Sequence, residues 1–168
     1  DGSLWLGTNG RGVNHFDPAS GQFTAFHVGD DVVFEILVDG EGYVWAGTFT
    51  TGLFRLDPAT GESVVYRHDP QNDRSLGEGA IQAMLLDRQG QLWVGTSVGG
   101  LNRYEPPSDD FVRYTLDPSD PYSLRDNNIH ALYQDRDGVM WVGTFNGGLS
   151  RYDSATGRFY TVTKSPEQ

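Results

Sequence analysis

The chain has 168 residues, of which 37% are hydrophobic and 21% charged, and a net charge of −11. This charge repels polyanions, so we expect no nucleic-acid partner and no direct contact with an anionic membrane surface. Cysteine is absent, which excludes disulfides, thiolate metal sites and cysteine nucleophiles. No apolar run reaches the length of a membrane span, and the first residues already lie inside a repeat, so we interpret the chain as a segment of a longer polypeptide.

A repeat organises the whole chain. Its register is set by four tryptophans, each followed by x-Gly-Thr: Trp5, Trp45, Trp93 and Trp141. Glycines stand three residues before and seven residues after each tryptophan, and an aspartate precedes the last three by six residues: Asp39, Asp87 and Asp135. Repetition at such a period is typical of propellers and solenoids. We predict one propeller segment over residues 1–168, with repeats at about 1–31, 32–79, 80–127 and 128–168.

Each complete repeat is predicted to contain four short strands. In the third copy these are residues 81–86, 92–96, 101–104 and 111–114, separated by turns rich in Asp, Asn, Pro and Gly. The first copy begins too late to hold the first of these strands. The expected fold is therefore all-β, with about four β-propeller blades of antiparallel strands, the first lacking its innermost strand, in part of a larger propeller. Leu76 and Leu124 are expected to be buried anchors in the long loops between blades.

The motif Asp-x-x-Gly-x-x-Trp-x-Gly-Thr, followed by Gly-Leu-x-Arg-Tyr-Asp, resembles the two-component regulator propeller repeat. The lead-in Ser-Leu-x-x-Asn-x-Ile at residues 123–129 also fits, whereas the first copy departs from the pattern at residues 13–16. The resemblance implies an extracytoplasmic or periplasmic sensor segment of a bacterial receptor that carries a histidine kinase, hybrid kinase or diguanylate cyclase. It also implies that the signal in some members is a carbohydrate fragment.

The repeated residues have structural and functional interpretations. A tryptophan in every copy suits a sugar-stacking platform, but we favour packing between neighbouring blades. Asp135 and the residues that follow resemble the start of a calcium loop, but they lack the later ligands, so we favour a β-turn closed by the aspartate side chain. Glu35 takes a strand position held by alanine in later copies, which suggests either a channel-lining charge or a wet first junction. We expect no catalytic residue, no metal site and no cofactor.

Positions that vary between copies are where a ligand site can lie, because the scaffold does not fix them. The loops between the second and third strands carry four such residues, which we predict to bind ligand: Arg11, Phe49, Phe145 and Asn146. This set suits a small molecule or an oligosaccharide, and the favoured function is non-catalytic ligand sensing. The alternatives are a protein–protein interaction scaffold and, more remotely, a propeller lyase or hydrolase. Self-association, or pairing with the rest of a propeller, is also expected because an open arc exposes apolar blade faces.

Overall fold

The structure, a computed structural model, describes residues 2–162, and every regular element in this range is a β-strand. Fifteen strands form four sheets of 3, 4, 4 and 4 strands, and each sheet is one continuous stretch of chain. The prediction of all-β blades, with an incomplete first blade, is confirmed.

Blade 1 contains β1 (Leu4–Gly7), β2 (Val13–Asp17) and β3 (Gln22–Phe26). Blade 2 contains β4 (Val33–Val38), β5 (Val44–Thr48), β6 (Leu53–Leu56) and β7 (Ser63–Tyr66). Blade 3 contains β8 (Ile81–Leu86), β9 (Leu92–Thr96), β10 (Leu101–Glu105) and β11 (Asp110–Tyr114). Blade 4 contains β12 (Ile129–Gln134), β13 (Met140–Thr144), β14 (Gly148–Asp153) and β15 (Arg158–Val162).

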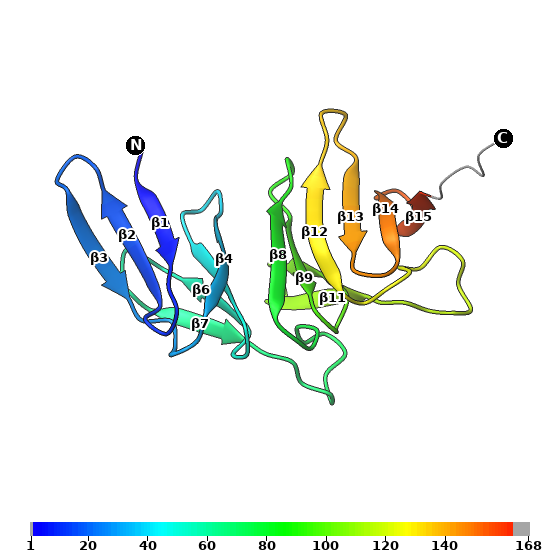
Figure 1. Cartoon of the computed structure of the whole chain (residues 1–168), viewed down its shortest axis with the longest axis horizontal. Coiled ribbons are helices and arrows are strands. Elements are labelled where there is room, and N and C mark those ends of the chain that lie inside the picture. Colours follow the sequence, from blue (N-terminus) through cyan, green and yellow to red (C-terminus); the bar gives the residue numbers. More distant parts are fainter. Residues whose placement is uncertain (1, 163–168) are drawn as a thin grey trace.

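The blades follow one another in an arc. Within each complete blade the strands pair antiparallel in chain order, and the first strands of consecutive blades, β4, β8 and β12, are neighbours. Figure 1 shows β3 and β15 at opposite ends of this arc. The membership of the sheets agrees with the expected repeats, while the limits of those repeats within the connecting loops stay a prediction.

The turn between the first two strands of a blade is built by the repeated aspartate. In blade 3, Asp87 Oδ1 accepts hydrogen bonds from the backbone N–H groups of Gln89 and Gln91, both at 2.9 Å. Gly90 closes the turn at a φ of 81°, a left-handed conformation that favours glycine. The other oxygen, Oδ2, accepts the indole N–H of Trp93 at 3.0 Å. One carboxylate therefore fixes both the hairpin and the orientation of the tryptophan, and the same bonds recur in blades 2 and 4.

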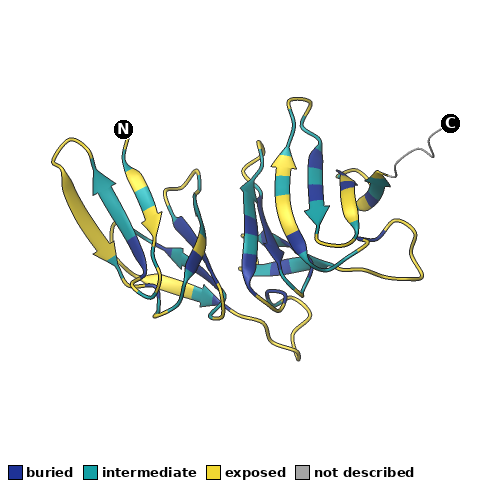
Figure 2. Ribbon diagram, viewed as in Figure 1, coloured by how far each residue is buried: buried dark blue, intermediate teal, exposed yellow. Residues whose placement is uncertain are grey.

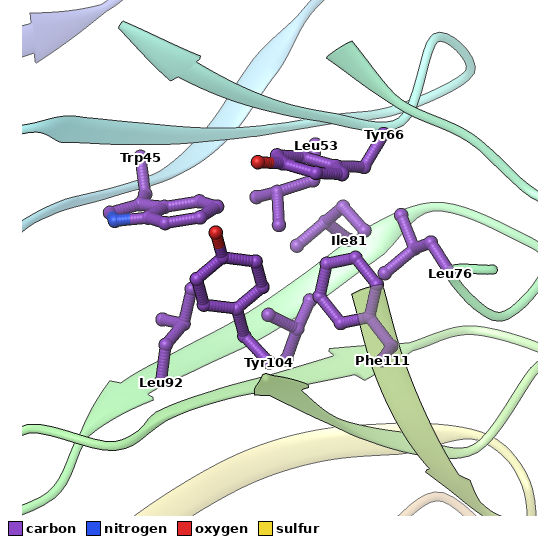
Figure 3. Close-up of a cluster of buried hydrophobic side chains, with 9 residues drawn as sticks. Trp45, Leu53, Tyr66, Leu76, Ile81, Leu92, Tyr104 and Phe111 are labelled. Atoms are coloured by element: carbon purple, nitrogen blue, oxygen red, sulfur yellow. The ribbon is translucent and has the colours of Figure 1, made fainter. Parts of the chain in front are cut away.

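The tryptophans of the middle blades lie in the junctions between blades. Trp45 of blade 2 packs edge-to-face on Tyr104 of blade 3, with 4.9 Å between ring centroids, and Phe111 meets Tyr66 at 5.4 Å (Figure 3). Trp93 makes the equivalent contact with Tyr152 of blade 4 at 5.0 Å. Burial of large apolar side chains contributes about 1.5–3 kcal/mol each, so these junctions hold the blades together.

The two end blades differ from this pattern. Trp141 is half-buried, and so is Trp5, which contacts His15 and Phe26 of its own blade and packs against the core that blades 1 and 2 share. For Trp141, the interpretation that each repeated tryptophan packs between two blades stays a prediction, because no described blade lies against that face of blade 4. Figure 2 shows the same trend, with buried residues concentrated in the middle blades and the outer strand β3 almost wholly exposed.

The long loops between blades are anchored as expected. Leu76 and Leu124 are both fully buried, and each belongs to the core of the junction that its loop reaches. These loops are therefore part of the packed structure and hold consecutive blades at a fixed position.

Candidate functional site

Three equivalent β-bulges lie where the inner strands begin. The pairing of β4 with β5 shifts register between Val33 and Glu35, and β8 and β12 shift at the corresponding places. The residue inside each bulge has no partner on the neighbouring strand: Phe34, Gln82 and His130. A bulge redirects the side chain of its extra residue, and bulges are common beside binding sites.

Each bulge lies next to the loop that joins the second and third strands of its blade. The backbone N–H of Phe49 donates to the carbonyl of Val32, and that of Phe145 donates to the carbonyl of Asn128. The predicted loop residues and the bulge residues therefore come together at the same end of the blades. We call this surface the bulge face, defined by Phe34, Phe49, Gln82, His130 and Phe145.

Two aromatic pairs dominate the bulge face. Phe34 and Phe49 meet edge-to-face with 5.5 Å between ring centroids, and His130 stacks on Phe145 at 5.2 Å and 28°. Phe49 is 52% exposed and Phe145 65% exposed, so neither ring closes over a neighbouring blade. Apolar rings held on a rigid backbone and open to solvent are suited to stacking against a ligand.

Blade 3 presents polar groups between these two aromatic pairs. Its bulge residue is Gln82, and its loop residue at the position of the two phenylalanines is Ser97. The Ser97 hydroxyl accepts the backbone N–H of Ala80 at 3.0 Å, whereas Gln82 Oε1 is buried without a hydrogen-bond partner among the described residues. A buried amide oxygen without a partner is unfavourable, so this part of blade 3 contains an unsatisfied polar group.

Acidic side chains fix the two loops that carry phenylalanine. Asp31 Oδ2 accepts the backbone N–H groups of Thr50 at 2.6 Å and Thr51 at 2.7 Å. Burial raises the pKa of Asp31, but these hydrogen bonds outweigh it and hold the pKa well below its usual range. Asp126 Oδ2 accepts the backbone N–H of Asn146 at 2.7 Å. Both loops are therefore held in place before any ligand arrives.

Two of the four predicted ligand-binding residues each pair with a bulge residue of their own blade. Phe49 and Phe145 lie in the aromatic pairs, and Asn146 is fixed through its backbone while its side chain is exposed. Arg11 is exposed on the blade 1 loop, and its side chain makes no hydrogen bond or ion pair within residues 2–162. The four residues therefore do not form one cluster.

Sequence reasoning missed the bulge residues. Phe34, Gln82 and His130 are spaced 48 residues apart, as the repeat requires, yet their chemical types differ from copy to copy beside a conserved Val or Ile. That contrast was the available signal. Glu35, next to the first bulge, is half-buried, and desolvation raises its pKa.

Two further features bear on chemistry. Within residues 2–162, no three His, Asp or Glu side chains lie close enough together to hold a metal ion. In the same part of the chain, no helix is long and apolar enough to cross a membrane.

Comparison with known proteins agrees with this architecture. The family model described as two component regulator propeller matches residues 75–98 and 123–146, which cover the inner strand, the aspartate turn and the tryptophan strand of blades 3 and 4. No curated protein sequence matches the chain.

Solved propellers match the fold over nearly all of the chain. PorZ, a surface component of the type-IX secretion system of Porphyromonas gingivalis, matches with a TM-score of 0.71 and 18% identity over 95% of this chain and 25% of its own. Virginiamycin B lyase from Staphylococcus aureus matches with a TM-score of 0.71 and 14% identity over 95% of this chain and 51% of its own. An extracellular domain described as part of a hybrid two-component system of B. thetaiotaomicron is 24% identical, with a TM-score of 0.41, over 94% of this chain and 27% of its own.

The chain thus spans about a quarter to a half of the length of these structures, and it matches part of larger propellers. At these identities the matches establish the fold alone. Lyase propellers share the architecture. Two of the four blades, which share one register, match the family model of the two-component regulator propeller.

Proposed function

We propose that the chain is a non-catalytic, ligand-sensing propeller segment of an extracytoplasmic bacterial signal-transduction receptor, and that it binds an oligosaccharide on the bulge face. The family match supports the sensing role, and the net charge of −11 is consistent with an uncharged ligand. The effector domain would lie elsewhere in the receptor.

One observation carries the ligand proposal. Equivalent bulges in blades 2 and 4 each place a second aromatic ring against an exposed loop phenylalanine, so the same device is built twice. Sugar rings have apolar faces that stack on aromatic rings and hydroxyls that need hydrogen-bond partners. The exposed Asn146 side chain and the partly exposed Gln82 side chain supply polar groups beside the rings. This combination favours a carbohydrate over a purely apolar or a purely charged ligand.

The test is binding of the chain to an oligosaccharide array, followed by calorimetry with each hit. Phe49→Ala and Phe145→Ala should each weaken binding at least tenfold, because each removes a stacking ring. Phe23→Ala is the matched control, since Phe23 is equally exposed but lies on the outer strand β3. Unchanged affinity in folded Phe49→Ala and Phe145→Ala variants would contradict the assignment of the site.

We also propose that the outer face of blade 1 is covered by the tryptophan face of another propeller blade. Leu4 and Leu6 are 54% and 43% exposed, whereas their equivalents in blade 2, Val44 and Ala46, are fully buried against blade 1. Light scattering tests whether a second copy of the chain supplies that blade. A dimer that Leu6→Glu dissociates would support self-association, and a strict monomer would leave this role to other blades of a larger propeller.

A further inference from the structure

The junctions between blades 2 and 3 and between blades 3 and 4 contain the same groove. Groove 2/3 has a volume of about 500 Å³, and groove 3/4 about 380 Å³. Ten lining positions correspond one to one, each pair separated by 48 residues. Groove 2/3 is lined by Asp39, Glu41, Tyr43, Trp45, Arg55, Leu86, Gly90, Leu92, Tyr104 and Pro106. Groove 3/4 is lined by Asp87, Gln89, Gln91, Trp93, Arg103, Gln134, Gly138, Met140, Tyr152 and Ser154.

An arginine spans the junction at groove 3/4. Arg88, in the aspartate turn of blade 3, extends its guanidinium to the corresponding turn of blade 4. There, Nη2 donates to the carbonyl of Asp135 and Nη1 to the carbonyl of Arg136, both at 2.8 Å. The two carbonyls lie side by side and accept both arms of one guanidinium. The aspartate turn of a blade can therefore accept a guanidinium group from the preceding blade through these two backbone carbonyls.

The site is open at groove 2/3. The residue equivalent to Arg88 is Gly40, so no side chain extends to the carbonyls of Asp87 and Arg88, which correspond to those of Asp135 and Arg136. A Cβ built on Gly40 meets nothing within 4 Å, and its φ lies outside the left-handed region. Within residues 2–162, no side chain donates a hydrogen bond to these two carbonyls, although Asp87 O accepts the N–H of Gly90 in the turn.

The lining of groove 2/3 suits a cation on an apolar stem. Glu41 replaces Gln89 at its rim, which adds a carboxylate. Leu86 replaces Gln134, and Pro106 replaces Ser154, so the walls beside the open carbonyls are more apolar. These changes complement the aliphatic chain and the charge of an arginine.

The arginine already in the groove does not oppose a second one. Arg55 Nη1 is ion-paired with Asp109 at 3.2 Å, and Arg55 Cζ lies 5.3 Å from the centroid of the Tyr43 ring, so the charge of this arginine is compensated. A paired arginine is also present at groove 3/4, where Arg103 is bonded to Glu105 at 2.7 Å and Arg88 spans the same junction.

From this internal template, we propose that groove 2/3 binds an arginine side chain presented by a partner polypeptide. Its guanidinium occupies the place that Arg88 takes in the next junction, bonded to the carbonyls of Asp87 and Arg88 and close to Glu41. Its stem lies against Leu86. This surface is at the opposite end of the blades from the bulge face, so it would bind a partner independently of the sensed ligand.

The test uses the indole N–H signals of the four tryptophans as site reporters in NMR spectra of the 168-residue chain. The probe is acetyl-arginine amide, and acetyl-citrulline amide, which has the same stem without the charge, is the control ligand. Acetyl-arginine amide should shift the Trp45 signal in a saturable manner and leave the Trp93 signal in place. Acetyl-citrulline amide should shift neither. No saturable Trp45 shift, or equal shifts with both ligands, would overturn the proposal.

Three variants sharpen the result. Gly40→Arg should fill the groove in the manner of Arg88 and abolish the Trp45 response, and Glu41→Gln should weaken it about threefold. Arg88→Gly is the matched control, because it opens groove 3/4 and should make the Trp93 signal respond. Persistence of the full Trp45 response in a folded Gly40→Arg variant would show that the probe binds elsewhere.

Discussion

The middle junctions and the end faces of this protein carry the same repeat motif but differ sharply in burial. Trp93 is 4% exposed and packs on Tyr152 of the next blade, whereas Trp141, with the same aspartate bond to its indole, is half-buried. The motif therefore sets the orientation of the tryptophan, and the neighbouring blade decides how much stability it contributes. Changes at equivalent positions in the two regions test this distinction.

The largest difference is expected for the tryptophans themselves. Trp93→Ala should lower the free energy of unfolding by about 3–5 kcal/mol, because it leaves a cavity between two blades. Trp141→Ala should cost about 1–2 kcal/mol, since part of its ring already contacts solvent. Denaturant unfolding of both variants measures the difference. Equal losses would show that the tryptophan acts mainly within its own blade.

Substitutions of the aspartates that bond the tryptophans should also cost more stability at the middle junction than at the end face, with smaller losses than the tryptophan substitutions. Asp87→Ala removes two bonds to the turn and one to Trp93, and should cost about 1–3 kcal/mol. Asp135→Ala removes the same set of bonds around Trp141, and we expect a loss near the lower end of that range. Thermal unfolding of the pair is a direct check. A larger loss for Asp135→Ala would contradict the dependence on burial.

A smaller contrast is expected on the opposite faces of the blades. Val94→Thr places a hydroxyl at a fully buried position and should cost about 1–3 kcal/mol. Leu6→Thr, at the equivalent position of blade 1, should change stability by less than about 0.5 kcal/mol in a monomer, because Leu6 is exposed. A substantial loss for Leu6→Thr would indicate that another blade covers this face in solution.

The smallest effect concerns Glu35 at the first junction. Burial raises the pKa of this carboxyl, so its neutral form is favoured in the folded state, and stability falls as the pH rises through its folded pKa. Glu35→Gln should therefore be slightly more stable than the native chain at pH 7, and this advantage should vanish below the unfolded pKa of the carboxyl. The free energies of unfolding of both chains, measured at pH 3 and pH 7, test this prediction. An advantage of equal size at both pH values would exclude ionisation as its cause.

Much of the fold follows from local pattern in the sequence. The aspartate, glycine and tryptophan of each copy form bonds within one hairpin, so their spacing alone predicts the strands and the turns. The same pattern identified the first blade as incomplete and placed Leu76 and Leu124 in the core. It also located Phe49 and Phe145 in loops that the structure shows to be exposed.

Only the tertiary structure decided what these elements present to their surroundings. The bulges at Phe34 and His130 depend on the register between two strands, which spacing along one strand does not specify. The difference between Arg88 and Gly40 becomes informative only once Arg88 is seen to bond the turn of the next blade. Burial of a tryptophan likewise depends on a neighbouring blade. The sequence by itself determined the local backbone, because the hydrogen bonds of each turn join residues only a few positions apart. The packing of blades decided the surfaces, because the contacts between blades join residues about 48 positions apart.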